Sequence, residues 1–413
     1  MSHRLPLALG ILLVLAGSTP AQVPEEIPPP RTTAGPQAGP LAPYLIENGL
    51  APQGARERFW VSGEYILGFI RGAKTPPLVT TSTDGTARVN AGVLGLASTT
   101  TLFGGGEVNN DDVRNGLRLQ GGYWFGPRFG VEAGFMILES KATLFNASSD
   151  VFPILARPFT DAITGASSSQ LIGFPGAAAG ASTGSIAVRA AADNIYGANI
   201  DFAERAVDEG WFRLTSLFGY RYFRFDDSVR IHQVMTPIDP NFTAGTQITA
   251  NDSFVTHNVF HGLDLGLRWQ FEAGALSLDV LTKMAVGHIN RSIDIEGDQT
   301  ITAPGAAPVV RQGGLLALSS NIGSTNQGDW KVMPELGANL GWQVRSNLKV
   351  SVGYSFLLLP AVARAGEQID TTVNQTLFPG ATVPQTGPQR PALLNQRSDL
   401  WLQTINFGVV FSY

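Results

Sequence analysis

The sequence of 413 residues has no cysteine, few charged residues and no recognisable nucleotide-binding loop. Without cysteine, the protein can have neither a disulfide scaffold nor a thiolate metal site. Charged residues make up 15% of the chain and the net charge is −5, with no basic cluster of the kind that binds nucleic acid. No GxxxxGK[ST] or GxGxxG motif is placed between a strand and a helix. We therefore expect no metal, no cofactor and no nucleic-acid partner.

Long apolar runs are also missing, apart from one near the start. Arg4 precedes an apolar run from Leu5 to Ala16, and small residues follow up to Ala21. This order predicts a secretory signal peptide over residues 1–21. A membrane anchor helix is the alternative, but it needs about 20 apolar residues. Because no other stretch is long and apolar enough, the rest of the chain could cross a membrane only as a β-barrel.

Glycine and aromatic residues, in contrast, are plentiful. The chain contains 47 Gly, 23 Phe, 8 Tyr and 7 Trp, a composition that favours alternating strands. Residues 22–58 are rich in proline and predict an extended periplasmic linker, with binding to a cell-wall partner as an alternative role. Residues 59–413 show no further break in composition and are expected to form one domain.

The last strand shows the pattern most clearly. From residue 399 to the end, large apolar side chains alternate with small or polar ones, and the chain ends on an aromatic residue. Aromatics at both ends of an apolar face are typical of a strand that crosses a bilayer. A C-terminal strand of this kind resembles the signal that the barrel-assembly machinery uses in bacterial outer-membrane barrels. Its outward residues would be Phe407, Val409, Phe411 and Tyr413.

The same alternation recurs along the domain and predicts an all-β fold. We expect a transmembrane antiparallel up-and-down β-barrel of ten strands, joined alternately by short periplasmic turns and long outer loops. Twelve strands are the alternative if the first or the fourth long loop hides a hairpin. The expected strands are residues 59–70, 116–125, 128–139, 195–205, 211–225, 257–271, 276–290, 332–344, 348–359 and 399–413.

The tryptophans fit this topology. Five fall at strand ends on the periplasmic side and predict an interfacial girdle there, whereas Trp401 falls at the outer end. The five are Trp60, Trp124, Trp211, Trp269 and Trp342.

The faces opposite the apolar ones would line the interior, where six positive and six negative side chains are predicted. This balance favours ion pairs across a mostly plugged interior. An open, ion-selective pore would more often have rings of one sign. The predicted interior residues, which would also set any selectivity, are Glu64, Arg118, Glu132, Asp201, Arg213, Arg221, Asp264, Arg268, Asp279, Lys283, Glu335 and Lys349.

Catalytic residues are hard to find in the sequence. His288 with Asp294, or His257 with Asp252, could form a surface site, but neither pair comes with an evident nucleophile. Acidic residues of the outer loops, such as Asp226 and Asp227, form only a weak set of Ca²⁺ ligands. We expect a protein that is not an enzyme.

Three stretches resemble a known family. They are residues 217–225 (LFGYRYFRF), the glycine-containing strand that follows Asn258, and residues 352–357 (VGYSFL) running into 364–370 (RAGEQID) and Asn374. Together they resemble the seventh of the numbered putative beta-barrel porin families, over roughly residues 59–413. The resemblance implies a barrel in the bacterial outer membrane and supplies no substrate or binding residues.

From these observations we expect porin-like passive passage of small solutes through a narrow, charge-lined interior. The alternative is a plugged structural or surface-display barrel that uses its outer loops for adhesion or envelope integrity, and a surface hydrolase is the third hypothesis. The expected partners are outer-membrane lipid, the barrel-assembly machinery and small solutes, while the solute and the oligomeric state stay open.

Overall fold

The computed structural model describes residues 58–108, 113–177 and 180–413. The predicted signal peptide (1–21) and all of the predicted linker (22–58) except Arg58 lie outside the described residues. Within the described ranges, no helix is long and apolar enough to cross a membrane.

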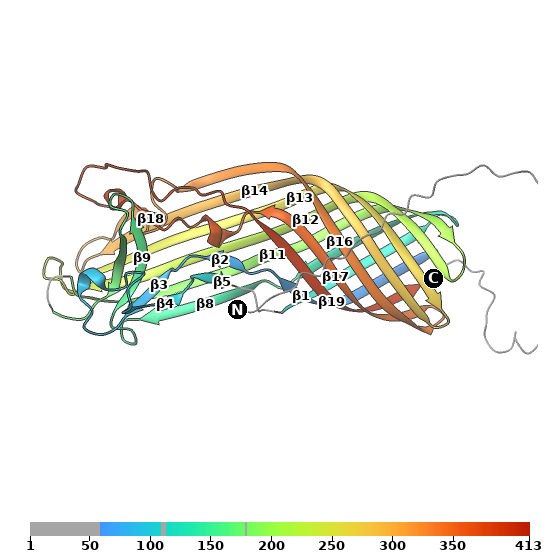
Figure 1. Cartoon of the computed structure of the whole chain (residues 1–413), viewed down its shortest axis with the longest axis horizontal. Coiled ribbons are helices and arrows are strands. Elements are labelled where there is room, and N and C mark those ends of the chain that lie inside the picture. The colour runs from blue at the N-terminus through green and yellow to red at the C-terminus, as the bar shows by residue number, and fades with distance from the viewer. Residues whose placement is uncertain (1–57, 109–112, 178–179) are drawn as a thin grey trace, which may run out of the picture. The chain divides into compact units, whose positions relative to one another are not determined.

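Ten antiparallel strands close into a ring, so the predicted barrel and its strand number are confirmed (Figure 1). β19 pairs with β17 on one side and with β1 on the other, which closes the barrel. In order around the ring, the strands are β1 (Phe59–Ile70), β6 (Arg114–Trp124), β7 (Phe129–Leu138), β11 (Ser182–Asp208), β12 (Phe212–Pro237), β13 (Gln247–Ala273), β14 (Leu276–Thr302), β16 (Gly323–Arg345), β17 (Leu348–Val362) and β19 (Ser398–Ser412).

Two more strands belong to the same sheet but not to the ring. β8 (Lys141–Ser148) pairs with the first half of β11, and β15 (Val309–Gln312) pairs with the last residues of β14. They widen the sheet to twelve strands at one end of the barrel. At the other end, which we call the turn end, four short connections join the ring strands in pairs, and the C-terminus lies there too (Figure 1).

Strands β11 to β14 are much longer than the sequence pattern predicted. They have 26 or 27 residues each, whereas a strand that crosses a bilayer needs about 9–11. Large parts of the predicted loops 140–194, 226–256 and 291–331 are therefore strand. The reason lies in the two faces of β12: Phe218 and Tyr220 point outward in the barrel half, but Val229 and Ile231 point inward and are buried in the other half. The apolar face thus changes sides, which hides the continuation of the strand.

The far halves of these strands form one wall of a second apolar core. We call the head the part built by this wall, by β8 and by a small sheet of β10 (Ser167–Gly173), β9 (Leu155–Asp161), β3 (Val79–Ser82), β4 (Thr99–Phe103) and β18 (Thr372–Val373). Side chains from wall and small sheet pack together, among them Ile231, Phe254, Leu155 and Phe159. The chain also contains β2 (Ala73–Thr75), β5 (Gly106–Val108) and the short helices η1 (Arg88–Asn90), η2 (Ala365–Gln368) and η3 (Gln375–Leu377).

Candidate functional site in the barrel interior

The outer wall of the barrel is apolar on every ring strand. Large hydrophobic side chains such as Leu119, Phe202, Leu265 and Leu340 point away from the interior and are exposed. The residues predicted for the outward face of the last strand are also exposed, namely Phe407, Val409, Phe411 and Tyr413. An apolar outer band of this kind matches the hydrocarbon of a membrane.

The predicted girdle of five tryptophans needs a correction. Trp211, Trp269 and Trp342 are exposed on the outer wall, as predicted. Trp124 is buried with only 8% exposure, and Trp60 packs against its cluster. The strand period explains the error, because Trp60 lies in phase with the inward residue Glu64 and not with the apolar face. Three tryptophans therefore face outward at the turn end, and two close the interior.

The middle of the interior is a layer of ion pairs. Arg118 of β6 lies opposite Glu64 of β1 and contacts its carboxylate at 3.1 Å. Arg268 of β13 reaches Glu132 of β7 with two bonds of 2.7 and 2.8 Å. Because β7 and β13 are not neighbours in the ring, this second pair spans the interior. Bidentate pairs fix geometry as well as charge.

The other members of this layer form one connected network. Lys283 donates to Asp201 at 2.5 Å and to Asp264 at 2.9 Å. Arg221 binds the same Asp264 at 3.1 Å and also binds Glu335. Strands β11, β12, β13, β14 and β16 are thus tied together through their inward side chains. All five side chains are nearly fully buried, so removing any one of them would leave a buried charge without its partner.

The three remaining predicted residues lie toward the turn end. Lys349 donates to Asp279 at 2.9 Å, which ties β17 to β14. Arg213 lies near the turn, 3.5 Å from Asp208 and 3.8 Å from Glu272. Eleven of the predicted residues therefore belong to ion pairs inside the barrel, and Arg213 belongs to the rim.

Apolar side chains fill the interior on both sides of the charged layer. On the turn side, Trp124, Ala203 and Leu217 pack together with Trp60. On the head side, inward aromatic and aliphatic side chains of every ring strand except β6 form one cluster that includes Ile66, Met136, Phe223, Phe260 and Leu402. The sequence prediction placed charged residues on this inward face but did not place these large apolar residues there.

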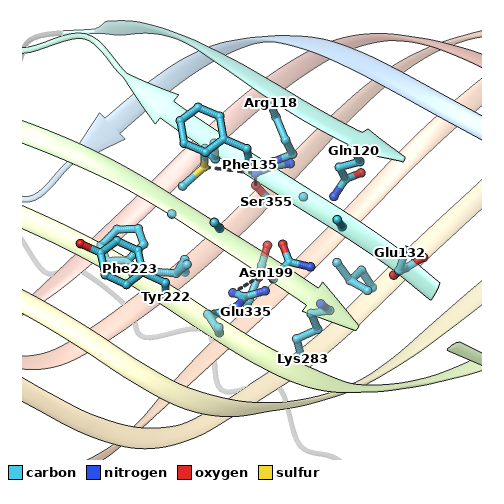
Figure 2. Close-up of a pocket in the computed structure, with 18 of the residues that line it drawn as sticks. Arg118, Gln120, Glu132, Phe135, Asn199, Tyr222, Phe223, Lys283, Glu335 and Ser355 are labelled. Carbon is cyan, nitrogen blue, oxygen red and sulfur yellow. Dashed lines mark hydrogen bonds and ion pairs between the residues drawn. The ribbon is translucent and has the colours of Figure 1, made fainter. Parts of the chain in front are cut away.

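The space left between the ion pairs is small. Figure 2 shows a cavity surrounded by Arg118, Asn199, Lys283, Glu335 and Ser355, with a volume of about 50 Å³. A cavity needs about 10–15 Å³ of this accessible volume to hold one water molecule, so this cavity has room for a few waters. In the described residues, the interior is thus a filled, layered core rather than an open channel.

A second set of buried ion pairs, nearer the head, was not predicted. Arg364 binds Asp227 at 2.6 Å and stacks on Phe225, and Arg291 binds Asp329. Arg364 begins the RAGEQID stretch, which forms η2 and buries Ala365 and Gln368. The resemblance pointed to this stretch, but its partner on β12 is far away in sequence and could not be predicted.

The histidine and acidic residues considered in the sequence have other partners. His257 Nδ1 lies 3.1 Å from Asp226, not near Asp252, which points inward and binds Arg157. His288 instead contacts Trp330 edge-to-face. Asp226 and Asp227 point to opposite faces of β12 and bind different partners. In the part of the chain that the structure describes, no group of three or more potential ligands could hold a metal ion.

A search of family models gives one match, Putative beta barrel porin-7, over residues 60–413. The chain belongs to this family. The match covers all ten ring strands, the whole charged layer and the head. It agrees with the resemblance drawn from residues 217–225 and 364–370, and it makes the protein an outer-membrane β-barrel of a porin family.

A search of curated proteins finds no match to this member of the beta barrel porin-7 family. Solved structures that are similar include Ail of Yersinia pestis, with 9% identity, 86% of this chain and 99% of that chain covered, and a TM-score of 0.20. The transport unit of the autotransporter AIDA-I from Escherichia coli has 8% identity, 88% and 93% coverage and a TM-score of 0.24. A Pseudomonas aeruginosa FadL homologue has 11% identity, 86% and 90% coverage and a TM-score of 0.25. Similarity at these TM-scores supports no conclusion about the barrel interior of this protein.

Proposed function

We propose that the protein is a closed barrel that anchors the head in the outer membrane and displays it on the cell surface. The observation that carries this proposal is the filled interior, in which a layer of ion pairs lies between two apolar layers. In a barrel only slightly wider than the eight-stranded kind, side chains suffice to fill the interior. The short turns would face the periplasm and the head would face outside, as in bacterial outer-membrane barrels.

The second candidate is porin-like passage of small solutes. It is favoured by the family and by the charged cavity of about 50 Å³ in the middle of the barrel. Passage would require the apolar layer around Phe223 and Phe260 to move aside, because these side chains are almost fully buried inside the ring. The charges of the middle layer would then set the selectivity.

Single-channel conductance of the full chain in a planar bilayer separates the two candidates. For the closed barrel we expect no discrete conductance steps from the wild-type protein. Steps should appear when Phe223 and Phe260 are both changed to alanine, because this removes two large side chains from the closing layer. Changing the exposed, outward Phe202 and Phe218 to alanine is the matched control and should give no steps.

Discrete steps from the wild-type barrel would refute the closed state and support passage. In that case, changing Arg221 or Lys283 to glutamate should raise the preference for cations, because both side chains face the cavity. A heat-modifiable band on an unboiled gel shows for each variant that the barrel is folded.

A further inference from the structure

On β12, β13, β14 and β16, outward side chains that are paired across neighbouring strands form rows around the outer wall. The strand registers align Tyr222 with His261, His261 with His288, and His288 with Trp330. Below this row, toward the turn end, the aligned outward residues are apolar, as Leu263 and Val332 illustrate. A row of amphipathic rings that borders an apolar band is typical of a membrane interface. The row therefore gives the level at which the hydrocarbon ends.

The next two rows begin in the headgroup zone and extend beyond it. Two residues of a strand span about 7 Å, and the polar zone of a bilayer is roughly 5–8 Å thick on each side. Val259, Asn290 and Gly328 are aligned in the first of these rows, and His257, Ser292 and Asn326 are aligned in the second. The first row would therefore be level with the lipid headgroups, and the second row would lie just outside them, next to the head.

These two rows line a groove in the outer wall. Its volume is about 470 Å³, and its lining includes His257, Asn290, Ser292, Asn326 and Gly328. Gly328 keeps the groove open, because a Cβ atom at this position would lie 2.2 Å from the ring of His288 and 3.0 Å from Asn290 Oδ1. Any larger residue would force these side chains to move.

The groove presents hydrogen-bonding groups that the protein does not use. Asn290 and Asn326 are exposed, and within the described residues their amides have no hydrogen-bond partner. An amide group both donates and accepts, which suits the hydroxyl groups of a sugar. A phosphate would be less suitable, because Asp294 lies next to Ser292 at 2.9 Å and the nearby Arg291 is bound to Asp329. The groove therefore favours a neutral ligand rich in hydroxyl groups.

We propose that this groove binds the saccharide headgroup of an outer-leaflet glycolipid, with the exposed Trp330 below it at the acyl boundary. Trp330 is 71% exposed although it lies at the membrane interface, where indole rings are stable against lipid. The proposal rests on the orientation with the head outside, but it does not depend on whether the interior is closed. It gives the barrel a specific lipid partner at one side of its wall.

The absence of cysteine allows a direct test. Ser324→Cys places a single thiol on the outward face of β16, one row above the groove, where a photo-crosslinking probe can be attached. The full chain is placed in phosphatidylcholine vesicles with or without a neutral diglycosyl diacylglycerol. We expect a covalent glycolipid adduct after illumination, and the free headgroup oligosaccharide without acyl chains should compete for it. Asn146→Cys on β8, far from the groove, is the matched control and should give no such adduct.

Substitution of the groove itself gives the second arm. With the probe at position 324, the pair Asn290→Leu and Asn326→Leu should lower the adduct yield about tenfold, as the loss of two hydrogen bonds would. The proposal is overturned if the yield is the same at positions 324 and 146, if it is unchanged by the leucine pair, or if free oligosaccharide does not compete. If the leucine variant does not fold, the competition experiment still decides, and none of these outcomes depends on conductance.

Discussion

Glu132 of β7 and Arg268 of β13 join two strands that do not touch, through two hydrogen bonds of 2.7 and 2.8 Å across the barrel interior. The pair lies between the tryptophans of the turn side and the apolar cluster of the head side. We therefore expect both charges to be needed together.

Changing Arg268 to methionine should destabilise the barrel by about 3–5 kcal/mol, because Glu132 would keep a buried charge without a partner. Changing Glu132 to leucine should have a similar cost, whereas the double variant should recover most of the stability. Urea unfolding of the refolded barrel in detergent, followed by tryptophan fluorescence, measures these differences. Glu204→Gln on the outer wall is the control, and equal losses in the two single variants and the double variant would contradict the pairing.

The tryptophans can be sorted experimentally into outward and inward sets. Brominated lipids quench indoles that touch the acyl chains, so phenylalanine at Trp211 or Trp342 should remove part of the quenching. The same change at Trp60 or Trp124 should leave it unchanged, since both rings face the interior. If the Trp60 or Trp124 variants also lost quenching, these two indoles would touch the acyl chains, and the predicted girdle of five tryptophans would be correct.

Asp252 holds a buried segment of the head in place. Its carboxylate accepts hydrogen bonds from the backbone N–H groups of Leu315, Leu316 and Ala317 and pairs with Arg157 at 2.6 Å. We expect Asp252→Ala to destabilise the head by about 3–5 kcal/mol, because the buried guanidinium would lose its counter-charge and keep only Gln233 as an acceptor, and three N–H groups would lose theirs. Hydrogen exchange should rise at residues 315–317.

Exchange in the barrel half of β13, for example at Leu265, should stay slow in the same variant. Equal acceleration there would mean that head and barrel unfold as one unit. Asp298→Ala is a suitable control, because Asp298 accepts from Asn251 in a contact that is only partly buried.

Stability of the head should also fall in acid. Backbone N–H groups of Thr164 and Ile163 bind Asp161, and Gln375 donates to it at 2.5 Å; the Thr164 bond contributes most to lowering its pKa. A lowered pKa means that the carboxylate stabilises the folded head above its ordinary pKa, and that this contribution is lost as the pH falls through the folded value. We expect acid to loosen the contact of β9 with η3.

Limited proteolysis between pH 6 and pH 3 can measure this loosening. Asp161→Asn should be cleaved more readily near neutral pH and should show a weaker dependence on pH than the wild type. A wild-type head that becomes more resistant in acid would contradict the assignment.

The sequence was sufficient to predict the ring but not the head. Alternation with aromatic outer faces identified all ten strands, because the lipid requires an apolar outer face on each of them. It could not show that β12 continues past Phe225, since the apolar residues there move to the opposite face. The sequence alone could have shown that Trp60 points inward, because Trp60 and Glu64 lie on the same face of their strand. The predicted girdle used only the position of the tryptophans at strand ends.

The interior was predicted in kind but not in detail. The equal numbers of positive and negative inward side chains indicated ion pairs, and these side chains do form ion pairs in the structure. Which residues meet could not be derived, because Arg221 and Glu335 come from strands separated by more than a hundred residues. The apolar layers around Phe223 and Phe260 were missed for a related reason. Whether a large inward side chain fills the interior depends on the side chains that face it from across the barrel, and the sequence does not show which these are.

Because β11 to β14 run unbroken from the membrane into the head, there is no joint between the two parts. A display domain on a flexible stalk can swivel, and one cut releases it. Here a protease would have to cut four hydrogen-bonded strands, and a pull on the tip would be transmitted along their backbones directly to the barrel wall. The head is therefore fixed in direction relative to the membrane, and whatever it contacts must approach it from a defined side.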